Sequence, residues 1–278
     1  MLGILLVFIG CLFFEAAGAI GKYEIIHHRE NIFTLAFLNN FFILLFFSVM
    51  VLTHDNFIFS WDSLPFLLAG LVVDILQVTF AGLAISQADH STMGFLRMGT
   101  VPLLLIIDYC LGYDIAPLQF LGIGMIIATI YILYKKHGFT RKGVWWVLAS
   151  TVNAAIGITL YKYNITHFNS VEEQQHMIHA CLIIYLIFAS IFFNKTNPFK
   201  LLTKGIFLVQ ATGTGIGALF DSFFYLYAPA SIITAAKRSV SAFFTIVFGT
   251  LYFHEHKFIT KMIALGFLVS GIIMLAVE

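Results

Sequence analysis

The sequence predicts an all-α membrane protein in which ten transmembrane helices form two inverted five-helix repeats. Three observations predict this fold class: an apolar composition, apolar runs long enough to cross a bilayer, and landmarks that recur at a constant offset.

The composition excludes an ordinary soluble domain. Of the 278 residues, 60% are apolar and 10% are charged, and the mean hydropathy is +0.95. A soluble domain carries about 25% charged residues, so this chain cannot cover a globule with polar surface. In lipid only helices and closed barrels satisfy their own backbone groups, and barrel strands would give short alternating segments. The net charge of +1 gives no indication of a nucleic-acid partner.

Charged residues and turn residues divide the apolar runs into ten expected spans. Each run has about 17–24 residues, as a helix needs to cross about 30 Å of hydrocarbon. The spans cover residues 2–21, 32–52, 64–87, 90–108, 115–134, 143–161, 176–193, 205–227, 230–251 and 258–277. Pro65, Pro117 and Pro229 lie near the starts of spans, where a missing N–H group costs no hydrogen bond. Pro102 falls inside the fourth span and should bend it.

The first span is expected to be a retained membrane helix. It starts at Met1 with no preceding basic stretch and contains Glu15, unlike a cleaved signal peptide. Cys11, Cys110 and Cys181 all lie inside apolar runs, which argues against a disulfide framework.

An internal duplication is the most informative feature. Lys22-Tyr23-Glu24-Ile25 recurs as Lys162-Tyr163-Asn164-Ile165, 140 residues later. Arg97 recurs as Arg238 and Asp114 as Glu255, each 141 residues later. The expected repeats are residues 1–135 and 136–278. Five spans in each repeat is an odd number, so the second repeat must enter the membrane from the opposite side, as in transporters with a midplane substrate site.

Several short motifs mark turns and helix starts in both halves: Gly112-Tyr113-Asp114, His254-Glu255, Leu121-Gly122-Ile123-Gly124, Leu265-Gly266 and Pro229-Ala230-Ser231. Through them the whole chain resembles the drug/metabolite transporter superfamily, in its EamA-like ten-helix branch. The first span, with Glu15-Ala16-Ala17-Gly18, also resembles that of the small multidrug resistance family. The loop acid of the superfamily is usually Glu, whereas the first half here has Asp114. The resemblance implies a multi-pass transporter of the cell (inner) membrane.

Two indications of orientation conflict. The loops and adjoining span ends on one side of the expected bundle carry 11 Lys and Arg residues, and the opposite side carries only Lys162. The positive-inside rule then places both termini outside the cell. The resemblance implies cytoplasmic termini instead.

Buried polar residues within the spans are the expected substrate-binding or coupling residues, because an ionisable group there normally faces protein or a water-filled cavity. They are Glu15, Asp74, Gln77, Arg97, Asn153, Lys237 and Arg238. Glu15 is either a coupling carboxylate or a structural partner of a buried arginine. Asp74 and Gln77 share one helix face and line a cavity or pack as a hydrogen-bonded pair. Asn153 contacts either substrate or another helix.

The three cations allow a binding or a structural role. Arg97 either contacts an anionic group of the substrate or neutralises Asp74 or Glu15. Lys237 and Arg238 are adjacent and point about 100° apart on a helix, so we expect one to face the cavity and the other to pair with Asp221. Snorkelling of their long stems to the interface is the alternative.

Glu172, His176 and His179 fall on one helical face, with spacing that also suits a divalent metal. A solvated helix entrance is the better explanation, because acids suit the positive end of the helix dipole. We therefore expect no metal site and no cofactor. Gly213 and Gly217 form a small-x-x-x-small face that favours close helix packing.

These features predict a secondary active transporter for a small polar organic metabolite, working by alternating access, with Glu15 or Asp74 coupling transport to protons. An organic-anion exchanger is the alternative within transport. A membrane enzyme using Glu172, His176 and His179, and a structural protein, are the alternatives outside it. The expected partners are the substrate, protons or a counter-substrate, and lipid, with the chain either a monomer or a homodimer.

Overall fold

The computed structural model describes residues 2–27, 31–53, 58–110, 116–137, 141–193, 195–226, 230–254 and 258–276, and these residues are helical apart from short turns. The α-helices are α1 (Leu2–Ile26), α2 (Ile32–Thr53), α3 (Leu64–Gln87), α4 (His90–Arg97), α5 (Thr100–Cys110), α6 (Pro117–His137), α7 (Arg141–His167), α8 (Val171–Phe192), α9 (Gly205–Phe224), α10 (Ala230–Phe253) and α11 (Phe258–Ala276). Two 3₁₀ helices, η1 (Trp61–Ser63) and η2 (Pro198–Thr203), precede α3 and α9.

The chain is an all-α membrane protein. Five helical segments within the described residues are long and apolar enough to cross a membrane: Ile32–Thr53, Trp61–Gln87, Gly143–His167, Val171–Phe192 and Gly205–Phe224. Large apolar side chains lie on the outer surface, including Leu52 at 85% exposure and Ile184 at 70%. Such exposure suits a lipid solvent, because water would penalise every one of these side chains.

The expected fourth span is wrong as a single helix. It divides into α4 and α5, with a break at Met98 and Gly99. Pro102 explains the position of the break, because a proline ring clashes with the carbonyl four residues earlier. Met98 is fully buried, and the Thr100 hydroxyl donates to the Arg97 carbonyl at 2.6 Å. The irregular backbone is therefore enclosed by protein, as it must be at membrane depth.

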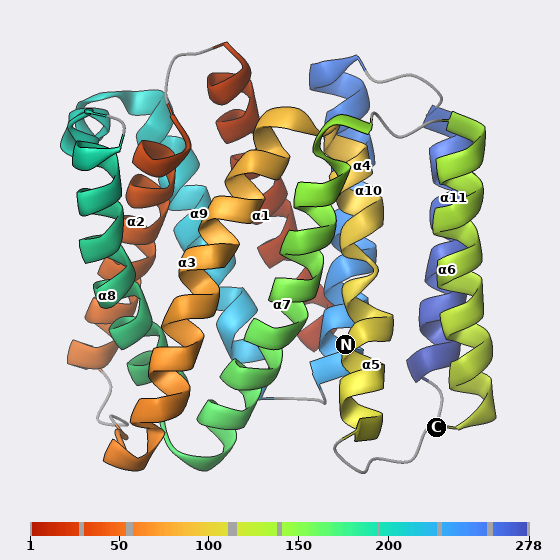
Figure 1. Ribbon diagram of the computed structural model, residues 1–278, viewed down its shortest axis with the longest axis horizontal. Coiled ribbons are helices and arrows are strands. Elements are labelled where there is room, and N and C mark those ends of the chain that lie inside the picture. The colour runs from red at the N-terminus through yellow and green to blue at the C-terminus, as the bar shows by residue number, and fades with distance from the viewer. Residues whose placement is uncertain are drawn as a thin grey trace.

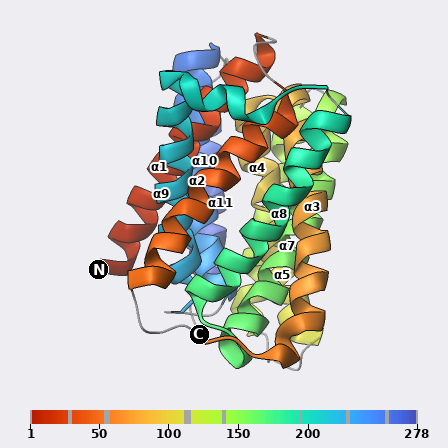
Figure 2. The same cartoon turned by 90° about the vertical axis from the view of Figure 1, so that its left-hand side faces the viewer.

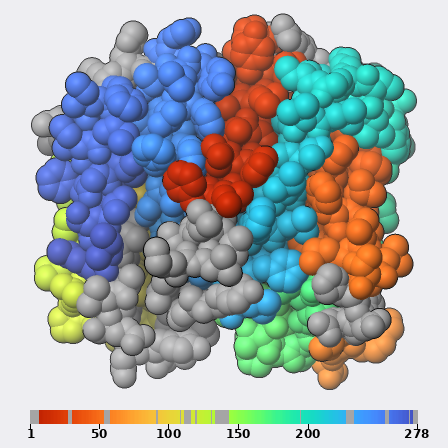
Figure 3. Space-filling view, turned by 180° about the vertical axis from the view of Figure 1, so that it is seen from behind, coloured from red at the N-terminus to blue at the C-terminus, as the bar shows by residue number. Residues whose placement is uncertain are grey.

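The helices run alternately up and down in Figure 1, and both ends of the described chain lie towards its lower side. The α2–α8 pair and the α6–α11 pair lie at opposite ends of the long axis. Between them α3 packs on α7, and α1 packs on α9 and α10. Figure 2 looks onto the α2–α8 end of the bundle, and Figure 3 shows α1 on the rear face between α9 and α10.

The two halves of the chain interlock. The most extensive packing joins α1 to α9, α3 to α7, α2 to α8 and α6 to α11. Each of these pairs takes one helix from residues 1–135 and one from residues 136–278. The halves therefore share one interior and do not form two separate bodies.

Glycines let α1 and α9 approach closely. A Cβ atom added to Gly217 would lie 2.8 Å from Phe14 Cδ2 and 3.1 Å from the Gly10 carbonyl oxygen. A Cβ added to Gly10 would meet Phe220 Cβ at 2.9 Å, and one added to Gly213 would meet Ala17 Cβ at 3.4 Å. The expected close-packing role of Gly213 and Gly217 is confirmed, and this approach brings Glu15 of α1 to the centre of the bundle.

Candidate functional site

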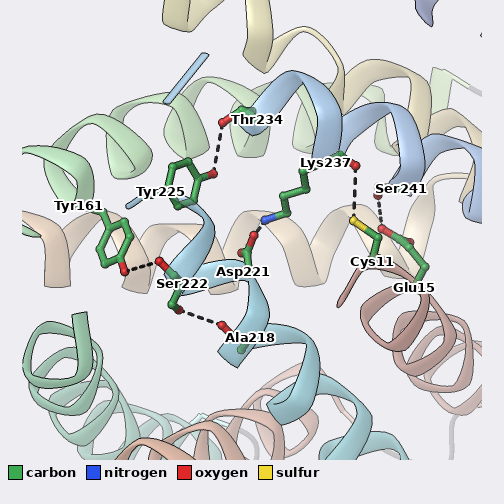
Figure 4. A network of polar contacts seen from close by, with 10 residues as sticks. All are labelled: Cys11, Glu15, Tyr161, Ala218, Asp221, Ser222, Tyr225, Thr234, Lys237 and Ser241. Atoms are coloured by element: carbon green, nitrogen blue, oxygen red, sulfur yellow. Dashed lines mark hydrogen bonds and ion pairs between the residues drawn. The ribbon is translucent and has the colours of Figure 1, made fainter. Parts of the chain in front are cut away.

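A cluster of charged side chains occupies the middle of the bundle, where α1, α4, α9 and α10 converge. Glu15 of α1 is 7% exposed and accepts a hydrogen bond from the Ser241 hydroxyl of α10 (Figure 4). Arg97 of α4 and Arg238 of α10 both lie close enough to Glu15 to attract its carboxylate. His90 Nε2 lies 3.9 Å from the second Glu15 oxygen.

Lys237 and Arg238 have different surroundings, as the sequence predicts. Lys237 Nζ donates to Asp221 Oδ2 of α9 at 2.5 Å, which joins α9 to α10 (Figure 4). The Arg238 side chain points elsewhere: its Nε is buried and has no hydrogen-bond partner within the described part of the chain. The expected pairing with Asp221 is thus confirmed for Lys237, and Arg238 faces the cavities.

A second polar group joins α3 to α7. Gln77 donates to the Ser150 hydroxyl at 2.8 Å and accepts from Asn153 Nδ2 at 2.9 Å. Asn153 Nδ2 also donates to the Val73 carbonyl at 2.8 Å. Asp74, one helical turn below Gln77, has no hydrogen-bond or ion partner among the described residues and faces a cavity. Gln77 and Asn153 therefore combine the two roles that the sequence leaves open, because they pack as a pair and also line that cavity.

Two cavities meet at these central groups. The lower cavity, of about 330 Å³, lies towards the start of α3 and the end of α7. The upper cavity, of about 380 Å³, lies towards the end of α1 and the start of α2. Both are lined by Asn40, Gln77, Ala154, Lys237 and Arg238. Of these two cavities, Asp74 and Asn153 line only the lower one, and Glu15 and Arg97 line only the upper one.

Polar side chains outside the expected substrate-binding set line the cavities as well. His179 Nδ1 lies 2.7 Å from Asn40 Oδ1, so this ring nitrogen carries a proton and donates. Gln210 donates to Asn39 Oδ1 at 2.8 Å, and the Tyr161 hydroxyl donates to the Ser222 carbonyl at 3.0 Å. The sequence marks His179 only by its spacing from Glu172 and His176, and no pattern marks Gln210 or Tyr161.

Two lysines form equivalent links at opposite ends of the bundle. Near the end of α1, Lys22 Nζ donates to the carbonyl of Ala88, the C-cap of α3, at 2.9 Å. Near the end of α7, Lys162 Nζ donates to the carbonyl of Tyr225, the C-cap of α9. A cation suits the C-terminus of a helix, where unpaired carbonyls collect negative charge. The first link lies at the upper end in Figure 1 and the second at the lower end.

The surroundings of the two lysines repeat as well. His27 Nδ1 bonds the Tyr23 carbonyl at 2.8 Å, and His167 Nδ1 bonds the Tyr163 carbonyl at 2.9 Å. In both places the tyrosine and histidine rings lie against each other. The sequence carries this signal, since the repeated motif extends beyond the isoleucine to Lys-Tyr-x-Ile-x-His.

The side chains of Glu172, His176 and His179, whose spacing also suits a metal, do not converge on one point. His176 Nδ1 lies 3.3 Å from the Ser48 hydroxyl, and His179 bonds Asn40. Among the described residues no three His, Cys, Asp or Glu side chains lie close enough together to hold a metal ion. Asp114 and Glu255, the loop acids of the duplication, lie outside the described residues.

Comparison of the chain with protein-family models and with curated protein sequences found no match.

Proposed function

We propose that the chain is a secondary active transporter, which moves a small polar organic molecule across the membrane by alternating access. The observation that carries this proposal is the pair of polar cavities that extend towards opposite ends of the bundle and meet at buried charges. A membrane protein must offset the cost of each buried charge, and such residues mark substrate or ion pathways. A purely structural bundle has no need of two polar cavities.

The proposed architecture is ten spans in two inverted repeats, as in the drug/metabolite transporter superfamily. In the proposed repeats α1 corresponds to α7, and α3 corresponds to α9. Exchanging the corresponding helices turns the α1–α9 contact into the α7–α3 contact. The same exchange maps the Lys22 link onto the Lys162 link. It also maps the upper cavity onto the lower cavity. All three correspondences support a two-fold axis in the membrane plane.

The helix contacts suggest which parts move. Because the halves interlock, the moving units are the α1–α9 pair and the α3–α7 pair, each with one helix from either half. The Lys22 link joins these units at the upper end and the Lys162 link joins them at the lower end. Opening one link while the other holds would expose one cavity at a time, and related halves keep the two open states close in free energy.

Asp74 is the better candidate for proton coupling. Glu15 already accepts from Ser241 and lies beside two arginines, whereas Asp74 faces the lower cavity without a partner. A bare carboxylate at membrane depth is costly, and a bound proton removes that cost. Tyr161, His179, Asp221, Tyr225, Lys237 and Arg238 are the other ionisable groups lining that cavity.

Substitution Asp74→Asn is expected to uncouple transport from protons. The cargo in this test is the compound, from a panel of polar metabolites, that most stabilises the purified protein against heating. Proteoliposomes containing a trapped pH dye should acidify when this cargo is added outside. Acidification should fall at least tenfold in Asp74→Asn, while exchange of labelled for unlabelled cargo persists.

The matched control is Asp62→Asn, the same change at an exposed acid outside both cavities. Proton movement in Asp74→Asn that equals the wild-type value would exclude Asp74 as the coupling group. The absence of any cargo movement by the wild-type protein would contradict the transporter proposal itself.

A further inference from the structure

Among the described residues, no acceptor bonds to the donor groups of the two central arginines, Arg97 and Arg238. Within the described chain neither the Arg97 nor the Arg238 guanidinium makes a hydrogen bond or a direct ion pair, although each carries five N–H donors. Both line the upper cavity and a central pocket of about 50 Å³. They lie close enough to repel each other electrostatically.

The charge around them does not balance. The central pocket is lined by three cations, Arg97, Lys237 and Arg238, and by two carboxylates, Glu15 and Asp221. Asp221 is taken by Lys237, and Glu15 is shared between the two arginines and Ser241. One positive charge therefore remains, in a place where an unpaired charge is costly.

The rest of the upper cavity limits the shape of a ligand. Gln210 lies beside Gly21 of α1, six residues and so about 9 Å along the helix from Glu15. Its Oε1 is a buried acceptor with no partner within the described chain. Around these polar groups the cavity wall is mainly apolar, with Ile25, Val78 and Ile85.

We infer that the substrate is a small organic monoanion, whose carboxylate lies between Arg97 and Arg238 and whose far end carries an uncharged hydroxyl donor for Gln210. This inference rests on the proposed transport function and specifies the substrate class of the same site. Guanidinium groups bind carboxylates through paired, charge-assisted hydrogen bonds, and a carboxylate supplies the single negative charge that is missing. The apolar wall matches a short hydrocarbon chain between the two polar ends.

Binding to the purified protein in detergent tests the inference without requiring transport. The probe is 6-hydroxyhexanoate, whose two polar ends are separated by roughly the 9 Å rise between Glu15 and Gly21. Isothermal titration should detect its binding, while 1,6-hexanediol, which lacks the carboxylate, should bind at least tenfold more weakly. Hexanoate, which lacks the donor, should bind with intermediate affinity, and inorganic phosphate more weakly than the hydroxy acid.

Removing the arginines should remove the preference for the anion. In Arg97→Gln and Arg238→Gln the affinity for 6-hydroxyhexanoate should fall about tenfold or more, as expected for the loss of charge-assisted hydrogen bonds. Arg97→Lys and Arg238→Lys keep the charge but lose the paired geometry, and they should give a similar loss if the glutamine variants do not fold. Lys261→Gln removes one positive charge from α11, outside both cavities, and should bind as the wild type does.

Equal binding of the diol and the hydroxy acid would overturn the inference, as would tighter binding of phosphate or unchanged affinity in the folded arginine variants. These outcomes are distinct from failure of the proposed function. A protein that binds the hydroxy acid but moves no cargo would refute transport alone, and one that transports only neutral or cationic cargo would refute the substrate class alone.

Discussion

Substitution Asp221→Asn is expected to lower the free energy of unfolding by about 3 kcal/mol, because it leaves the Lys237 charge without its carboxylate. Breaking a buried ion pair from one side costs about 3–5 kcal/mol. We expect the lower end of this range, because the Lys237 and Asp221 side chains retain 18% and 26% exposure to the cavities. Thermal unfolding of the purified protein in detergent, followed by fluorescence, measures the loss.

A double variant separates the buried charge from the lost hydrogen bond. Asp221→Asn combined with Lys237→Met removes both charges, and its stability should return to within about 1 kcal/mol of the wild type. Asp62→Asn, the same change in the exposed helix η1, should have no measurable effect. A double variant no more stable than Asp221→Asn would show that the pair does not stabilise the α9–α10 contact as described.

Replacing either end lysine by methionine is expected to open the bundle at one end only. Lys162→Met removes the link from α7 to α9 at the lower end, and Lys22→Met removes the link from α1 to α3 at the upper end. A hydrogen bond from a charged group contributes about 1.5–3 kcal/mol, and 1.4 kcal/mol is tenfold in an equilibrium constant. The population open at the affected end should therefore rise about tenfold or more.

Single cysteines in the two cavities report this opening. Gly70→Cys lies in the lower cavity and Gly18→Cys in the upper cavity, and the added Cβ has room at both positions. In a background with Cys11, Cys110 and Cys181 replaced by alanine, Lys162→Met should speed maleimide labelling of Gly70→Cys, and Lys22→Met that of Gly18→Cys. Lys261→Met should change neither rate. Equal acceleration of both cysteines by either lysine variant would mean that the links do not act as separate closures.

Hydropathy predicted most of the fold, and the differences lie where polar residues continue a helix. The first span was expected to end at residue 21 and the sixth at residue 161, but α1 ends at Ile26 and α7 at His167. Lys22 and Lys162 are charged and therefore seemed to end their spans, whereas in the structure each satisfies the carbonyl of a neighbouring helix. Likewise α8 begins at Val171, before the expected residue 176, because Ser170 caps its first turn through the Glu173 N–H group.

The candidate site could be predicted in part, because charge within an apolar run is conspicuous. Asp74, expected either in a cavity or in a hydrogen-bonded pair, lines the lower cavity, and both members of the Lys237–Arg238 pair line the two cavities. The sequence did not determine which acid lies beside each buried cation. Arg97 had Glu15 and Asp74 as alternative acids, and in the structure it lines the same central pocket as Glu15, whereas Asp74 lines the lower cavity. Hydropathy gives no information on how deep each helix lies in the bundle or on how it is rotated about its axis.

The most direct test of alternating access is the sidedness of the two cavities in the chain with its native lysines. Sealed vesicles with a membrane-impermeant maleimide, applied to one face at a time, should label Gly18→Cys from one side of the membrane and Gly70→Cys from the other. Addition of a bound substrate should change the two labelling rates in opposite directions. Labelling of both cysteines from the same side would contradict the account.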